Sequence, residues 1–131
     1  MVKITLNDHP IELNSIEELG MALDDIDRVW GFELWATVIG GPRLCMLRNC
    51  ENAWLMYLQN DDLGFTSVGN LAMEGTARFT LSNGQVDEYP LAWCIDVEQC
   101  YKAVAYFYVN DGEKPEWIHW QASQHVTDIT R

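Results

Sequence analysis

Residues 32–39 read Phe-Glu-Leu-Trp-Ala-Thr-Val-Ile and residues 53–58 read Ala-Trp-Leu-Met-Tyr-Leu, two runs rich in large apolar side chains. Successive side chains of a strand point to opposite faces, so each run would place bulky apolar groups on both faces. The opposed sets are Leu34 with Val38 against Trp35 with Ile39, and Leu55 with Tyr57 against Trp54 with Met56. We therefore predict two central strands covered on both faces, either by two layers of the same chain or by a partner.

Turn-forming residues divide the middle of the chain into further strands. Gly, Pro, Asn and Asp gather in clusters at residues 40–42, 49–52, 60–62 and 82–84. Each cluster favours a reversal between antiparallel strands. Residues 77–81 alternate regularly, and Ala77, Phe79 and Leu81 are predicted to point inward. Asn83-Gly84 then predicts a hairpin turn, because both positions tolerate a positive φ.

The two ends of the chain carry shorter strand signals. Residues 2–6 and 11–13 predict two strands around a turn at Asp8-His9-Pro10. Near the other end, residues 117–120 read Trp-Ile-His-Trp and predict a last strand. A polar tail is expected from residue 121 to residue 131.

Two segments have the pattern of amphipathic helices. Asn14-Ser15 offers an N-cap before the acidic pair Glu17-Glu18, and apolar residues then recur every three or four positions. These residues are Ile16, Leu19, Leu23 and Ile26. Asp96 offers a second N-cap, with Gln99 placed to complete a capping box, before a helix that ends at residues 110–112. The predicted buried side of this helix consists of Val97, Tyr101, Val104, Ala105 and Tyr108.

These elements predict one domain over residues 1–131. A chain of this length can bury roughly two-thirds of its unfolded surface, and 48% apolar residues supply enough material for a core. The order of the elements favours an α+β fold, with two principal helices packed against a mainly antiparallel sheet.

Acidic side chains dominate the charge of the chain. The 20 Asp and Glu residues against 8 Lys and Arg residues give a formal net charge of −12. The resulting field repels the phosphate backbone of nucleic acids and attracts basic surfaces, so we expect no direct binding of nucleic acid. The acidity also has a simpler explanation, because net charge keeps a protein soluble. Charge alone does not decide between these explanations.

The sequence also bears on location and redox state. It lacks a run of about 18 apolar residues and the apolar core of a signal peptide, so we expect a cytoplasmic protein without a membrane span. The four cysteines are then expected as reduced thiols. Cys45, Cys94 and Cys100 have apolar neighbours, whereas Cys50 lies in a polar turn and is expected to be exposed.

Patterns of common catalytic and metal sites are missing from the sequence. The cysteines are spaced C-x4-C and C-x5-C, and the three histidines are scattered near the termini, so we expect no metal. The sequence has no nucleophile elbow and no phosphate-binding glycine motif, so we expect no catalytic residue and no cofactor. His119 is expected to be a half-buried strand residue, and His125 part of the tail.

A more specific pattern lies in the second half of the chain. It consists of Gly69-Asn70, Gly75-Thr76, the helix at residues 97–108, Lys114-Pro115 and Trp120, in this order. The pattern resembles the first family of immunity proteins of bacterial polymorphic toxin systems, in particular those that act against a secreted cytosine deaminase of double-stranded DNA. The resemblance covers residues 64–120. Its glycines, Asn70 and Pro115 are expected to shape turns and to stop the helix, which are structural roles.

The resemblance implies a cytoplasmic antidote, without enzymatic activity, that binds a cognate secreted toxin and occludes its active site or substrate groove. A toxin that grips nucleic acid presents a basic cleft, which an acidic partner can occupy. As toxin contacts we predict Asp61, Asp62, Phe65 in a Gly64-Phe65 turn, and Glu74 in the glycine loop, because exposed acidic and aromatic groups suit an interface. Each of these residues also fits an ordinary solvated loop.

Two other functions fit the sequence. A small enzyme would use His119 with nearby carboxylates, and replacing His119 by alanine would then abolish its activity. A general acidic adaptor that mimics DNA would bind many basic proteins, with a steep dependence on salt, instead of one toxin.

Overall fold

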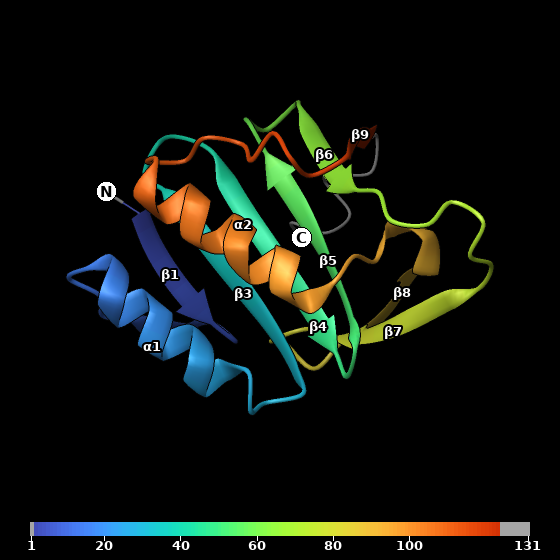
Figure 1. Cartoon of the computed structure of the whole chain (residues 1–131), viewed down its shortest axis with the longest axis horizontal. Helices are drawn as coiled ribbons and strands as arrows, with labels where there is room; N and C mark the ends of the chain where they lie inside the picture. Colours follow the sequence, from blue (N-terminus) through green and yellow to red (C-terminus); the bar gives the residue numbers. More distant parts are fainter. Residues whose placement is uncertain (1, 124–131) are drawn as a thin grey trace.

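A seven-stranded antiparallel sheet with two helices on one face forms the body of the molecule (Figure 1). The computed structural model describes residues 2–123. In sheet order, the strands are β2 (His9–Ile11), β1 (Val2–Leu6), β3 (Gly31–Val38), β4 (Arg43–Asn49), β5 (Asn52–Leu58), β6 (Gly64–Ser67) and β9 (Trp120–Ser123). The other elements are the helices α1 (Ile16–Ile26) and α2 (Val97–Val109), the hairpin β7 (Thr76–Thr80) with β8 (Val86–Pro90), and the short 3-10 helix η1 (Leu91–Trp93). The predicted α+β class is confirmed.

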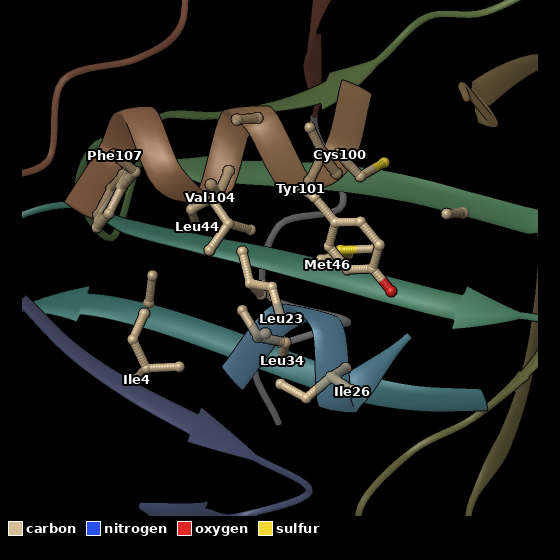
Figure 2. Packing of buried hydrophobic residues seen from close by; sticks show 14 of the residues in the cluster. Ile4, Leu23, Ile26, Leu34, Leu44, Met46, Cys100, Tyr101, Val104 and Phe107 are labelled. Atoms are coloured by element: carbon tan, nitrogen blue, oxygen red, sulfur yellow. The ribbon is translucent and has the colours of Figure 1, made fainter. Parts of the chain in front are cut away.

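Both faces of the central strands are covered by the chain itself. On one face, Leu34, Leu55 and Tyr57 belong to the main core beneath α1 and α2, and Figure 2 shows side chains of both helices and of the sheet meeting there. On the other face, Trp54 and Met56 pack with Phe79 and Tyr89 of the β7–β8 hairpin. The alternation within residues 53–58 therefore serves two separate cores, and the two-layer prediction is confirmed for these strands. Ile39, which we expected to be covered as well, lies after the end of β3 and is 72% exposed.

Helix α1 begins as predicted, with Ser15 as its N-cap. The Ser15 Oγ accepts a hydrogen bond of 3.1 Å from the backbone N–H of Glu18. Leu19 and Leu23 are buried against the sheet, as is Ile26 at the end of the helix. Ile16, which we expected in the same stripe, is 39% exposed, because this first helical residue lies beyond the edge of the core.

The buried face of α2 differs from the predicted one. Its buried residues are Cys100, Tyr101, Ala103, Val104 and Phe107, whereas Val97, Ala105 and Tyr108 are only half-buried. The small side chains of Cys100 and Ala103 allow the helix to approach the sheet closely. Asp96 caps the helix by accepting a 2.8 Å bond from the Glu98 N–H, but Gln99 turns away from the expected capping box and accepts a bond from Trp117.

The hairpin turns follow ordinary turn chemistry, with one shift. Gly84 has a φ of 88° and donates its N–H to the Leu81 carbonyl, so a single left-handed residue closes the β7–β8 turn.

At the N-terminus, the turn lies at Asn7-Asp8, whose φ angles are 49° and 68°, and not at residues 8–10. Strand β2 therefore covers residues 9–11 instead of 11–13. Pro10 is tolerated in β2 because β2 is an edge strand.

The last strand also begins later than predicted. It covers residues 120–123 instead of 117–120, and the Trp120 indole N–H donates to the Pro115 carbonyl at 2.8 Å. This bond explains the shift, because it holds the chain before Trp120 in a turn-like path. His119 is exposed and not half-buried, and its backbone carbonyl accepts a hydrogen bond from the N–H of Val68. His125 lies outside the described residues.

Within residues 2–123, neither helix combines the length and apolar character needed to cross a membrane.

Candidate functional site

A shallow acidic hollow lies where the end of α2 meets the end of β5. Its volume is about 480 Å³, and its lining includes Tyr57 and Tyr106 together with the carboxylates of Asp111, Glu113 and Glu116. In Figure 1, the segment between α2 and β9 runs along the same side of the molecule as the turn between β5 and β6. The hollow therefore combines residues that are far apart in the sequence.

The turn after α2 holds the acidic residues in place. Asp111 and Gly112 both adopt a positive φ, of 54° and 98°, which reverses the chain as the helix ends. The Gly112 N–H donates to the Phe107 carbonyl at 2.9 Å, and the Tyr57 hydroxyl donates to the Gly112 carbonyl at 2.7 Å. Because Tyr57 lies in β5, this bond ties the turn to the sheet.

Negative charge in the hollow acts on its two tyrosines. Burial raises the pKa of Tyr57, and the nearby carboxylates of Glu113 and Glu116 raise it further. The pKa of Tyr106 is also raised, first by desolvation and then by Glu113, whose carboxylate accepts a long bond of 3.4 Å from its hydroxyl. Desolvation disfavours a charge of either sign, whereas the carboxylates of Glu113 and Glu116 disfavour only a negative one, so it is these carboxylates that give the hollow its negative character.

An exposed tryptophan lies beside the hollow. Trp117 is 44% exposed, and its ring meets the Tyr106 ring edge-to-face at a centroid distance of 5.1 Å. Its indole N–H donates to the Gln99 side chain at 3.0 Å. These two contacts hold a large aromatic ring at the surface, and aromatic residues are common anchors of protein interfaces.

Two of the four predicted contact residues lie in the turn that follows β5. Asp61 and Asp62 are exposed in the turn between β5 and β6, two and three residues after Gln59, which lines the hollow. The Asn60 side chain accepts the backbone N–H groups of Asp62 and Leu63 and so shapes this turn. The turn carries the two carboxylates in solvent, as expected.

The other two predicted residues are placed differently. Phe65 is not in a turn but within β6, because it pairs with Tyr57 and Ala122 on the neighbouring strands. It is half-buried, and the Lys114 ammonium lies 3.8 Å from its ring centroid. Glu74 is exposed in the loop after β6, at the opposite end of that strand from Asp61 and Asp62. The structure thus does not bring all four residues together.

The glycine motif of the second half has a structural role. A Cβ on Gly69 would lie 1.9 Å from the Cys94 carbonyl oxygen, so only glycine fits where this loop crosses the end of η1. Asn70 closes the following turn by accepting the Ala72 N–H, and Gly75 has a φ of 92°. These residues shape the loop around Glu74, as the sequence predicted.

A second acidic surface lies between the two helices. A groove there has an apolar floor that includes Leu23 and Tyr101, with Asp24 and Glu98 at its rim. The groove joins a hollow that is lined by Glu51, Asp96 and the nearly buried Arg48.

Arg48 neutralises part of the charge on this second surface. Its Nη1 lies 2.7 Å from Asp27 Oδ1 and 2.9 Å from the Tyr101 hydroxyl, which itself donates to Asp27. Burial, followed by the hydrogen bond to Asp27, raises the pKa of Tyr101 to about 12. This network links α1, β4 and α2, so its first role is structural.

The cysteines and histidines do not form a metal centre in the described part of the chain. Among residues 2–123, no three His, Cys, Asp or Glu side chains converge so that they could hold a metal ion. Cys45 and Cys100 are buried, Cys94 is half-buried, and Cys50 is exposed as predicted. Burial raises the pKa of the Cys45, Cys94 and Cys100 thiols.

The chain matches a known protein family over both of its halves, although it matches no single curated protein. A search of curated proteins found no match. A family model described as "Immunity protein Imm1" matches residues 7–122.

Proposed function

Since this chain belongs to the Imm1 family of immunity proteins, which are non-enzymatic inhibitors, we propose that it neutralises its cognate toxin by covering a basic, nucleic-acid-binding cleft. Family membership implies toxin neutralisation and sets aside an enzyme based on His119. The kind of toxin and the manner of inhibition are the proposed part. A deaminase of DNA is the toxin that we propose, acting in the cytoplasm where the immunity protein meets it.

The charge of the protein is the observation that supports this partner. A net charge of −12 attracts a basic cleft over a distance, and the acidic hollow and the β5–β6 turn each carry part of that charge. Once bound, the same carboxylates repel the phosphates of the substrate. Inhibition then follows from occupying the groove, without any covalent chemistry.

The predicted contact residues have different roles in this proposal. Asp61 and Asp62 face the toxin directly from the β5–β6 turn. Phe65 acts indirectly, because its ring holds Lys114 at the edge of the hollow. Glu74 contacts the toxin from the separate loop after β6, as a second and independent part of the interface.

The first test is inhibition of the toxin encoded beside this gene. The purified protein should form a stoichiometric complex with that toxin domain and abolish its deamination of DNA. An active toxin in the presence of excess immunity protein would contradict the proposal. A general DNA mimic would bind an unrelated basic protein equally well, so histone or polylysine serves as the comparison at several salt concentrations.

A matched pair of double variants tests the β5–β6 turn. Asp61→Asn with Asp62→Asn removes two adjacent charges, and Asp24→Asn with Asp25→Asn removes two adjacent charges from α1, so both proteins keep the same net charge. We expect association with the toxin to slow at least about threefold more for the first variant, because rim charges act mainly on the on-rate. Equal effects would show that only the net charge matters and that the turn is not a contact.

A further inference from the structure

We infer that Trp117 is the anchor of the interface and receives an arginine side chain of the toxin, an inference that rests on the proposed function. The surface in question consists of Trp117, Tyr106, Glu113 and Glu116, and we call it the aromatic–acidic patch. It combines an exposed indole with the carboxylates of the neighbouring hollow.

The indole of Trp117 is held in place before any partner arrives. Its N–H is bonded to Gln99 of α2, and its ring is packed edge-to-face against Tyr106 of the same helix. Binding therefore costs little side-chain entropy, which is a property of residues that contribute most to an interface. A large ring that is 44% exposed also has apolar area left to bury.

The chemistry beside the indole favours a cationic occupant. Glu113 and Glu116 precede Trp117 in the sequence and line the hollow together with Asp111 and one cation, Lys114, so its carboxylates outnumber its cations. Both glutamates act on Tyr57 through their negative charge. The guanidinium of arginine can stack on an indole while its N–H groups bond to carboxylates, whereas the compact lysine ammonium does this less well. Arginine is also a usual residue of nucleic-acid-binding clefts.

Trp30, a second exposed tryptophan, serves as a comparison for Trp117. Trp30 is 58% exposed, but the guanidinium of Arg48 in the same chain already lies 5.7 Å from its ring centroid. Arg48 also neutralises Asp27 in the nearby acidic groove. Lys114, the cation that lines the hollow beside Trp117, lies over the Phe65 ring instead. Trp30 is therefore a matched control, because it is an exposed tryptophan whose own ring already has a guanidinium of the same chain near it.

Calorimetry with the cognate toxin domain tests the anchor. We expect Trp117→Ala to weaken binding at least about 30-fold, as for a central anchoring residue, and Trp30→Ala to weaken it less than about threefold. Trp117→Phe should recover part of the loss. Thermal melts should show that each variant remains folded. If Trp117→Ala binds within threefold of the wild type, the inference is wrong while toxin neutralisation stands; if the wild-type protein itself does not bind, both fall.

A double-mutant cycle identifies the occupant. Arginines in the toxin cleft are replaced one at a time by alanine or lysine, and each variant is titrated with wild-type and Trp117→Ala immunity protein. One arginine should lower affinity at least about tenfold against the wild type but have little further effect against Trp117→Ala. Additive effects for every arginine would overturn the assignment. Full retention of affinity by the lysine replacement would point to a simple charge contact and would also overturn it.

Discussion

Replacing Gly69 by alanine should destabilise the protein, although it adds only one methyl group. The new Cβ would lie 1.9 Å from the Cys94 carbonyl oxygen, and an ordinary carbon–oxygen contact is about 3.3 Å, so the two backbones must separate by about 1.4 Å. The separation strains the 2.7 Å bond from the Gly69 N–H to the Ala92 carbonyl. Overpacking costs about 1–3 kcal/mol and a lost hydrogen bond about 1 kcal/mol, so we expect a loss of about 3 kcal/mol.

The same substitution at Gly20 is the matched control. Gly20 lies within α1, and a Cβ there would meet no atom within 4 Å, so alanine should stabilise the helix by about 0.5–1 kcal/mol. Urea unfolding should therefore show opposite signs for the two variants, and Gly69→Ala should lower the melting temperature by about 10 °C. A Gly69→Ala protein within 0.5 kcal/mol of the wild type would refute the steric explanation of the glycine motif.

Two further predictions concern titratable groups. The pKa of Tyr101 in the folded protein is raised to about 12, so its contribution to stability should be complete below pH 10 and lost as the pH rises through 12. Unfolding free energies between pH 9 and 12 should fall more steeply for the wild type than for Tyr101→Phe, by at most about 1.4 kcal/mol per pH unit, and equal slopes would contradict this. Cys50 should be the first thiol to react with Ellman's reagent, because the other cysteines are buried or half-buried with raised pKa values. Cys50→Ser should remove the fast phase, and its persistence would show that another thiol is accessible.

Much of the fold follows from local patterns in the sequence. The central strands were predictable because bulky apolar residues occupy both faces, and the N-caps Ser15 and Asp96 were predictable from their side-chain chemistry. The N-terminal turn was misplaced because Asn7-Asp8 and Asp8-His9-Pro10 are both good turn formers, and only sheet pairing decides between them. The face of α2 was misjudged because small side chains, which permit close packing, carry a weak hydrophobic signal.

The candidate site was only partly predictable. The exposure of Asp61 and Asp62 follows from their polar turn, but Phe65 belongs to a strand that its preceding glycine concealed. The aromatic–acidic patch escaped prediction because tertiary contacts assemble it from α2 and from the segment that follows. One signal was present in the sequence: Glu113, Glu116 and Trp117 fall within five residues, just after the end of a helix.

The two covered faces of the sheet limit where a partner can bind. Because α1 and α2 occupy one face and the β7–β8 hairpin packs on the other, the large apolar side chains of β3, β4 and β5 are buried or half-buried within residues 2–123. Loops, strand ends and outer helix faces are left for binding, and many exposed side chains there are carboxylates. Charge at such positions accelerates encounter but contributes little to the lifetime of a complex, which depends on desolvated anchors. In our proposal, an aromatic residue held at the surface supplies such an anchor, and Trp117 is the residue that we assign to this role.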